Sequence, residues 1–349
     1  MKITSDNLFK ASFTILTKLG ADEHEARQVS ESLVRANMRG IHTHGVKYLK
    51  MISERTKAGM LTVPTHASVI KESQAVTLID GHNGLGQAAA SLAMKTSMQC
   101  ASQFGVSMTF LRNTNNIGFL SYYTMMAAAE DMIGICACNA AASISLWGGM
   151  EPVLGSNPIS IAFPTDTEFP LVMDLSVSNV ARGKIREAER LNKSIPPTWA
   201  FGPDGEPTED PAEALKGCLM PIGGPKGVAL AIMVDLLCGL ISGSKYSRDV
   251  KTFHKLLGAT GVGAFFLAIN PKGMIDPSLL KRLIGEYIVN IKNIKSAEHV
   301  SKIYRPGEIE NENEARSAQE GIEIDSGTVE MLHTILASLN CDLTLKPKQ

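Results

Sequence analysis

The chain has 349 residues, of which 44% are hydrophobic and 20% charged, and its formal net charge is −1. This length is enough for two modest domains or one large domain with a sizeable core. The nearly neutral charge balance gives no electrostatic support for a nucleic-acid partner or for an anionic membrane surface.

No segment has the pattern of an export signal or a membrane span. The N-terminus lacks the apolar core of a signal peptide. The longest apolar run, 228–242, contains Asp235 and is shorter than the roughly 20 residues that a spanning helix needs, so it predicts a buried core helix. The six cysteines form no CxxC pair and most have apolar neighbours. We therefore expect reduced thiols in a cytoplasmic protein.

Amphipathic helices open the chain. Ser5 is a candidate N-cap for a first helix, whose apolar residues share one face and which ends at Gly20. A capping-box pattern that begins at Asp22 predicts a second helix, and Gly40 ends it. A third helix is expected over 46–57.

The middle of the chain changes in periodicity. Short apolar runs predict strands within 67–81 (two strands) and at 106–113, 133–140, 158–165, 169–176 and 264–271. Helical patterns lie between them at 86–105, 121–132 and 228–241. The segment 196–217 is rich in proline, glycine and acidic residues and predicts a long ordered loop or an excursion from the core. After residue 275 the pattern is helical and polar again, with a solvated acidic stretch at 307–325. The sequence therefore predicts a mixed α/β core with helical ends.

A loop with two histidines follows the second helix. His44 is a candidate proton donor or acceptor, because an imidazole titrates near pH 6.5. Thr43 could hydrogen-bond the ring or a substrate oxygen, and Lys47 or Tyr48 could bind a carboxylate or polarise a carbonyl. The alternative is a polar surface turn, and the spacing leaves His42 as a rival for the same role.

Two further segments carry polar groups at the ends of apolar runs. The sequence GGPKG at 223–227 precedes a predicted helix, so its backbone N–H groups and lysine suit a phosphate, although an ordinary Gly-Pro turn has the same pattern. Asp174 ends a predicted strand and could orient a histidine, accept ribose hydroxyls or simply cap a helix. The turn GSNPIS at 155–160 is equally ambiguous.

Several common kinds of site are disfavoured. The chain contains no GxGxxG between a strand and a helix and no GxxxxGK[ST], so a standard Rossmann or P-loop domain is not expected. The spacing in GHNGLG at 81–86 is wrong and predicts a turn. No GxSxG occurs, and no histidine, cysteine or carboxylate cluster has metal-ligand spacing, so we predict no metal site.

Several segments together resemble the type-2 malate/L-lactate dehydrogenase family over nearly the whole chain. They occur in the family order: RGIHTHG, GSNPISIAFP, VMDLSVSNVARGKI, SIPPTWAFGPDGEPTEDP, GGPKG, VDLLCGLISG and YRPGE. The family also includes ureidoglycolate dehydrogenase, 2,3-diketogulonate reductase, sulfolactate dehydrogenase and cyclic-imine reductases. The resemblance implies a non-Rossmann α+β fold, with a mostly antiparallel central sheet wrapped by helices. It also implies a helical domain of 1–65 and 275–349, a central NAD- and substrate-binding domain of 66–274, and a homodimer.

The resemblance implies an NAD(P)-dependent oxidoreductase that transfers a hydride between nicotinamide and a small 2-hydroxy/2-oxo acid such as malate or L-lactate. We expect NAD, with NADP still open. The alternatives are ureidoglycolate oxidation, cyclic-imine reduction, and cofactor binding without catalysis. His44 matches the family's catalytic histidine, and Thr43 takes the place of the preceding serine. The cofactor-binding positions implied are Ala140, Asn157, Asp174, Leu175, Ser176, Pro225, Lys226, Gly307 and Glu308.

The chain departs from the family pattern where the substrate is expected. Tyr48 stands where many members carry an arginine that binds the substrate carboxylate. Asn116 stands where the ureidoglycolate enzyme has a histidine, and an amide cannot exchange a proton near pH 7. We expect Thr43 and Asn116 to position the substrate oxygens, with Lys47 or Tyr48 near the carboxylate.

Overall fold

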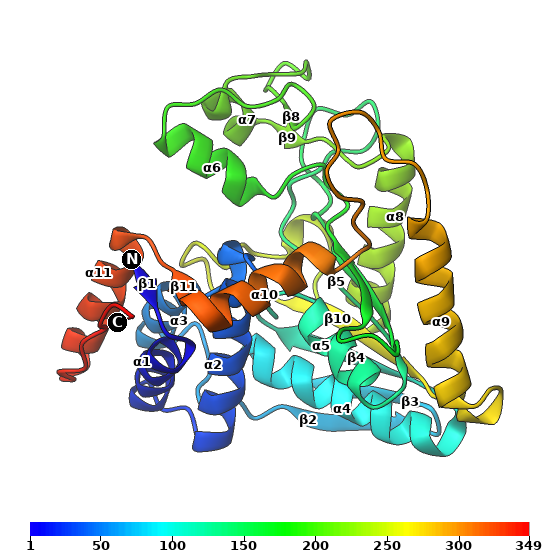
Figure 1. The fold of residues 1–349 in the computed structure, drawn as a ribbon. Helices are drawn as coiled ribbons and strands as arrows, with labels where there is room; N and C mark the ends of the chain where they lie inside the picture. Colours follow the sequence, from blue (N-terminus) through cyan, green and yellow to red (C-terminus); the bar gives the residue numbers. More distant parts are fainter. Residues whose placement is uncertain (349) are drawn as a thin grey trace.

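A seven-stranded sheet forms the centre of the computed structural model, which describes residues 1–348 (Figure 1). In spatial order its strands are β2 (Ser68–Ser73), β3 (Val76–Asp80), β4 (Val106–Thr114), β10 (Val262–Ile269), β5 (Ile133–Cys138), β6 (Ile159–Phe163) and β7 (Leu171–Leu175). Neighbouring strands are antiparallel except for the parallel pair β3 and β4. The predicted α+β fold with a mostly antiparallel, non-Rossmann sheet is confirmed.

Helices cover both faces of this sheet. On one face lie α4 (Gly86–Phe104) and α5 (Ser121–Ala129), and on the other lies α8 (Pro225–Asp235), which continues into the π-helical turn η2 (Leu236–Ile241). Alanines on the buried side of α4 let that helix approach the sheet closely. The predicted helix at 228–241 is therefore only partly right. It begins at Pro225, a residue suited to a first helical turn, and its end is wound as a π-helix.

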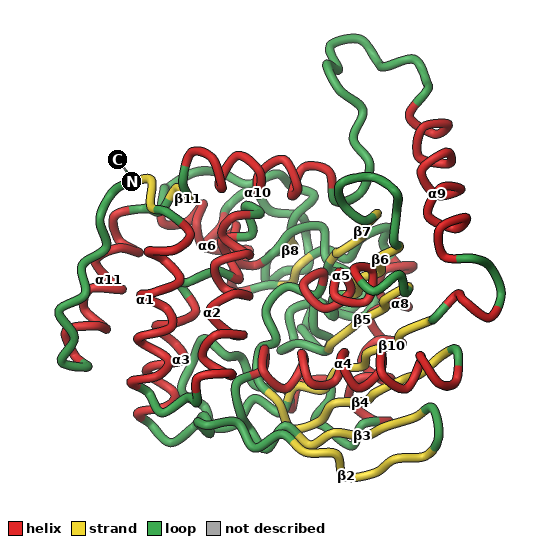
Figure 2. Tube along the Cα trace, turned by 60° about the horizontal axis from the view of Figure 1, so that its bottom comes forward, coloured by secondary structure: helices red, strands yellow, loops and turns green. Residues whose placement is uncertain are grey.

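A bundle of helices stands at one end of the sheet (Figures 1 and 2). It comprises α1 (Ser5–Lys18), α2 (Glu23–Met38), α3 (Tyr48–Lys57) and α11 (Ser326–Ser338). These helices share an apolar core of their own. The ends of the chain meet here, because β1 (Lys2–Ile3) pairs with β11 (Ile322–Glu323).

Two helix starts test the capping predictions. The side chain of Thr4, not Ser5, caps α1 by accepting a hydrogen bond from the Asn7 N–H. Asp22 caps α2 as predicted, since its carboxylate accepts from the Glu25 N–H at 2.8 Å. In a capping box the Glu25 side chain would bond back to the Asp22 N–H. Here the Glu25 carboxylate instead accepts from the Thr65 N–H at 3.0 Å.

A small lobe lies beyond the β7 edge of the sheet. It contains α6 (Arg182–Arg190), β8 (Ala200–Phe201), α7 (Pro211–Lys216) and β9 (Cys218–Leu219) around a separate apolar core (Figure 1). The segment 196–217, predicted as a long ordered loop or an excursion, is part of this lobe, and it holds a short strand and a short helix in place of a continuous loop. Asp210 caps α7 and Pro211 occupies its first turn.

The C-terminal third returns across the molecule. The helix α9 (Pro277–Lys292) lies on the side opposite α11 in both views (Figures 1 and 2). The predicted acidic stretch at 307–325 is mainly the helix α10 (Glu308–Glu320), which packs against α2. Three short turns, η1 (His42–His44), η3 (Ser247–Asp249) and η4 (Pro271–Gly273), complete the described elements. Within residues 1–348 no helix is both long and apolar enough to cross a membrane.

Candidate active site

The two-histidine loop is held against the end of α2. It folds as η1, and Asn37 in the last turn of α2 binds it at both ends. The Asn37 Oδ1 accepts from the Val46 N–H at 2.8 Å, and Nδ2 lies 3.0 Å from His42 Nδ1. A Cβ atom on Gly45 would stand 2.0 Å from that Oδ1. The glycine is therefore required for the close approach of Asn37, and His42 is engaged in holding the loop.

His44 is half-buried beside Thr43 and Tyr48. Its Nδ1 is 3.1 Å from Thr43 Oγ1, and its ring stacks on Tyr48 with 5.8 Å between centroids and 15° between planes. Desolvation by the surrounding protein, and then the nearby His254, lower the His44 pKa to about 4. The side chain nevertheless keeps some accessible surface. The imidazole is therefore neutral at pH 7 and is still partly accessible to solvent.

Tyr48 forms a buried platform under His44. It is 7% exposed, and its opposite neighbour is Phe253, with 5.6 Å between ring centroids. His254 lies against the same ring at 5.6 Å. Desolvation raises the Tyr48 pKa far above its ordinary value, with the charge of Arg186 opposing that rise. The phenol is therefore neutral and supplies no charge to a carboxylate.

Arg186 and His254 are site residues that the sequence did not indicate. His254 lies far along the chain in an irregular segment, and Arg186 sits on α6, a short and very polar helix with one buried residue. Nothing local to either residue marks it as a neighbour of Tyr48.

The predicted partners Lys47 and Asn116 lie differently. Lys47 points toward α11, where its Nζ is 3.0 Å from the carboxylate of Asp325, the N-cap of that helix. Asn116 is partly buried, and its Oδ1 accepts from the Gly118 N–H at 2.9 Å. Among residues 1–348 its Nδ2 has no hydrogen-bond partner, so that amide is available as a donor.

Asp174 lies at the end of β7. Its Oδ2 accepts from the Ser121 N–H at 2.7 Å, and desolvation by the surrounding protein raises its pKa to about 6. Asp174 is nonetheless an exposed residue, so its carboxylate is accessible to solvent. Desolvation, and then the charge of Asp174, raise the pKa of the Cys138 thiol at the end of β5.

The residues after Asp174 are held by the backbone. Leu175 is the last residue of β7 and pairs with Ile159. The hydroxyl of Ser176 lies 3.1 Å from the Ser178 carbonyl oxygen. Both residues are half-buried and follow directly on the accessible carboxylate.

The GGPKG segment makes a glycine-rich entry to α8. Gly223 and Gly224 have φ of 58° and 63°, a conformation that favours glycine. Pro225 and Lys226 are exposed, and Lys226 forms no ion pair among residues 1–348. The exposed ring of Trp147 would stand 3.2 Å from a Cβ on Gly224. A helix N-terminus with a free lysine and an exposed aromatic ring fits the phosphates and flat rings of a dinucleotide.

Asn157 connects this helix to the sheet. It is buried with φ of 26°, and its Oδ1 accepts from the Ala140 N–H at 3.0 Å. Its Nδ2 donates to the Ala231 carbonyl oxygen at 2.8 Å. The end of β5 is thereby fixed to α8, which gives Asn157 a positioning role.

Gly307 and Glu308 anchor the segment between α9 and α10. Gly307 has φ of 83° and packs against Val172 of β7. The Glu308 carboxylate lies 2.7 Å from Lys292 Nζ and accepts from the Arg305 N–H at 2.9 Å. Burial opposes ionisation, but these hydrogen bonds prevail and lower the Glu308 pKa to about 2. This charge is already balanced within the protein.

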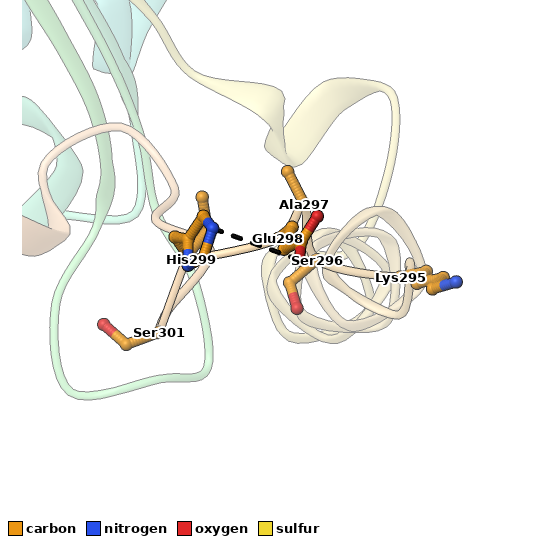
Figure 3. Close-up of a pocket in the computed structure, with 7 residues that line it drawn as sticks. Lys295, Ser296, Ala297, Glu298, His299 and Ser301 are labelled. Atoms are coloured by element: carbon orange, nitrogen blue, oxygen red, sulfur yellow. Dashed lines mark ion pairs between the residues drawn. The ribbon is translucent and has the colours of Figure 1, made fainter.

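A hollow in the loop that follows α9 carries no such constellation. The hollow in Figure 3 is open and lined by residues 295–301 of a single loop, with His299 and Glu298 at 4.0 Å. It contains none of the predicted site residues. In the part of the chain that the structure describes, no three histidine, cysteine or carboxylate side chains are grouped as for a metal ion.

Comparisons with known proteins agree with this architecture. A family model described as malate/L-lactate dehydrogenase matches residues 3–333. The chain is 35% identical over 343 residues to L-sulfolactate dehydrogenase of Methanocaldococcus jannaschii, with 98% of each chain covered. It is 30% identical over 325 residues to ureidoglycolate dehydrogenase (NAD(+)) of Escherichia coli K12, with 93% of each covered.

A solved structure extends the likeness to three dimensions. Malate dehydrogenase from Entamoeba histolytica matches with a TM-score of 0.94 and 30% identity, and the match covers 97% of this chain and 98% of that one. A dehydrogenase family implies a nicotinamide cofactor, which agrees with the entry to α8. The chain therefore belongs to the malate/L-lactate dehydrogenase family of oxidoreductases.

Proposed function

We propose that this protein interconverts small 2-hydroxy acids and 2-oxo acids with a nicotinamide cofactor, at a site centred on His44. The proposal rests on the protonation state and the contacts of the His44 imidazole. The ring is neutral at pH 7, hydrogen-bonded by Thr43, stacked on Tyr48 and accessible from solvent. These are the properties of a positioned proton acceptor and donor.

Thr43 suits both directions of the reaction. With Nδ1 facing the Thr43 hydroxyl, Nε2 is left for a substrate oxygen. A hydroxyl both donates and accepts, so it supports either neutral tautomer of the imidazole. In oxidation Nε2 takes the proton of the substrate hydroxyl, and in reduction it returns a proton to the carbonyl oxygen. Such proton transfer is worth about 10²–10⁴ in rate.

Substrate charge tunes the same ring. A pKa of about 4 leaves the free enzyme with a neutral but weakly basic His44. A bound carboxylate places negative charge nearby, which favours the imidazolium and raises the His44 pKa. Proton exchange therefore becomes efficient in the substrate complex. Asn116 Nδ2 is the expected donor to a substrate oxygen.

The cofactor, when bound, supplies the hydride acceptor or donor. Lys226 and the N-terminus of α8 would bind its phosphates, and the Asp174 carboxylate would accept from a ribose hydroxyl. Leu175, Ser176 and the Gly307 turn would line the adjacent wall. We propose NAD, which is supported by the NAD(+) named for the ureidoglycolate dehydrogenase relative.

We also propose the domain arrangement and assembly that the family resemblance implies. The separate apolar core of α1, α2, α3 and α11 supports a helical domain of 1–65 and 275–349 beside a central domain of 66–274. Exposed apolar side chains on α8 and α9, such as Met233 and Val289, support a homodimer. Six free cysteines support a cytoplasmic location.

The test is cofactor oxidation with defined substrates. NADH and NADPH would be tried with oxaloacetate, sulfopyruvate, pyruvate, 2,3-diketogulonate and piperideine-2-carboxylate, and ureidoglycolate would be tried with NAD. We expect turnover of at least one 2-oxo acid. The His44→Gln variant should lose about 10²-fold or more in kcat while NADH binding persists. His24→Gln, on an exposed position of α2, is the matched control.

Two results would contradict the proposal. Turnover of only the imine or of ureidoglycolate would move the chemistry away from plain 2-oxo acids. NADH binding without any turnover would support a cofactor-binding protein that lacks catalysis.

A further inference from the structure

The loop that carries His44 offers no free cation to a substrate carboxylate. Tyr48 is buried and neutral. Lys47 is paired with Asp325 on the far side of the loop. A 2-hydroxy or 2-oxo acid bound at His44 must therefore find its positive partner on another element, since a carboxylate taken from water without one is strongly disfavoured.

The first turn of α6 lies directly against this loop. A Cβ placed on Gly183 would be 3.1 Å from Thr43 Cγ2, so the α6 backbone packs closely against the Thr43 side chain there. Residues three apart share a helix face. Arg186 therefore projects from the side of α6 that meets the His44 loop, beyond the contact point.

Arg186 is free to bind a ligand. Its side chain is exposed, and among residues 1–348 it makes no hydrogen bond and no ion pair. The other arginines of α6 are engaged: Arg182 donates to the Leu215 carbonyl oxygen at 2.5 Å, and Arg190 pairs with Glu187 at 2.6 Å. One guanidinium of this helix thus stands without a partner.

The charge of Arg186 acts on the His44 platform. It opposes the rise in the pKa of Tyr48 and contributes to the lowered pKa of His254. Both rings pack together, and His254 in turn acts on His44. The contact at Gly183, together with the electrostatic effect on two packed rings, places the guanidinium beside the His44 platform.

Resting on the proposed function, we infer that Arg186 binds the substrate carboxylate next to His44, in place of a cation from the His44 loop. A guanidinium pairs with a carboxylate through two parallel hydrogen bonds, which fixes orientation as well as affinity. The substrate class is accordingly a 2-oxo or 2-hydroxy acid with a free C1 carboxylate. Uncharged esters and amides of the same acids are poor substrates.

The experiment compares an acid with its methyl ester in the full-length enzyme. KM and kcat would be measured for the best 2-oxo acid and for its methyl ester, in the wild type and in Arg186→Gln, Arg186→Lys and Arg190→Gln. We expect Arg186→Gln to raise KM for the acid about 10- to 100-fold, with the NADH Kd unchanged. Its KM for the ester should stay the same, so the preference for acid over ester collapses. Arg186→Lys should raise KM for the acid less than Arg186→Gln does, because lysine keeps the positive charge but cannot form the two parallel hydrogen bonds of a guanidinium.

The outcomes separate the two proposals. If the wild type reduces none of the acids, the proposed function falls and this inference falls with it. If the wild type reduces an acid, but Arg186→Gln keeps the acid–ester preference shown by the Arg190→Gln control, the inference is overturned and the proposed function stands. A structural role of Arg186 would change the acid and the ester alike, and that result also overturns it.

Discussion

Asn37 and Val46 are joined by a hydrogen bond of 2.8 Å from the Val46 N–H to the Asn37 side-chain oxygen. This bond closes the His44 loop against α2, and the Asn37 Nδ2 group engages His42 in the same loop. The position of His44 therefore depends on a side chain of the preceding helix.

Gly45→Ala should disturb this closure. The added Cβ would stand 2.0 Å from Asn37 Oδ1, so the amide must move and the Val46 N–H loses its partner. We expect a loss of about 1–3 kcal/mol in the free energy of unfolding and a lower kcat. Urea unfolding and steady-state kinetics would measure both. Gly273→Ala, where a Cβ meets nothing within 4 Å, is the control. Equal behaviour of the two variants would refute this account of Gly45.

Thr43 should matter through its hydroxyl alone. Thr43→Val keeps the shape but removes the group 3.1 Å from His44 Nδ1, whereas Thr43→Ser keeps it. We expect Thr43→Val to lower kcat roughly 10- to 100-fold, because a misoriented base transfers protons poorly. Thr43→Ser should remain near wild type, and NADH binding should be unchanged in both. A similar loss in both variants would point to packing instead.

The lowered pKa of His44 predicts a pH-dependent stability. Between pH 6.5 and about 4, the His44 side chain binds a proton in the unfolded chain but stays neutral in the native protein. Protonation therefore favours the unfolded state, and the free energy of unfolding decreases as the pH is lowered through this range. His44→Gln removes this contribution. Its stability relative to wild type should therefore improve from pH 7 to pH 5 in urea titrations.

Asp174 supplies the opposite control. Its native pKa of about 6 lies above the ordinary 3.8, so the native carboxyl binds a proton first and gains stability as pH falls through this range. Asp174→Asn should therefore lose stability relative to wild type over the same interval. If both variants track the wild type at every pH, neither group has a shifted pKa.

The ion pair between α2 and α10 should be important for the fold. Arg39 is 3% exposed, and its guanidinium lies 2.6 Å from the Glu314 carboxylate. Glu314→Gln leaves the buried Arg39 guanidinium without its carboxylate partner. We expect a loss of about 3 kcal/mol in the free energy of unfolding, measured in urea. Glu187→Gln removes an exposed pair with Arg190 and should cost less than 1 kcal/mol. Comparable losses would mean that burial does not decide the contribution.

The sequence predicted what is local and periodic. The helix after Asp22, the helix at 86–105 and the central strands have strong apolar patterns, and all are present. Within the site, Thr43, His44 and Tyr48 come together because they share one turn. The α6 helix was missed because it is short and very polar, with Ile185 as its single buried residue.

Contacts between segments that are distant in the chain could not be predicted from the sequence. Lys47 was expected near the substrate, but it pairs with Asp325, which lies far along the chain on α11. His254 joins Tyr48 from an irregular segment. Such contacts depend on how helices and loops are placed by the whole fold, and no local pattern encodes that placement.

Lys226 provides the sharpest test of the cofactor site. It is exposed at the N-terminus of α8, beside two glycines with positive φ, and it makes no ion pair within residues 1–348. Its removal should leave the fold intact but weaken binding of a pyrophosphate. We expect Lys226→Ala to raise the NADH Kd about tenfold, the loss of roughly one charge-assisted hydrogen bond. Binding would be followed by the change in nucleotide fluorescence.

The matched control for Lys226 is Lys184→Ala, an exposed lysine on α6. Lys226→Ala should leave the KM for the 2-oxo acid nearly unchanged at saturating NADH, because the lysine contacts only the cofactor in the proposed site. Its effect should also shrink as salt is added, since ions screen an exposed charge. An unchanged NADH Kd would mean that the Gly-Pro turn is an ordinary helix start. The phosphates of the cofactor would then bind elsewhere on the molecule.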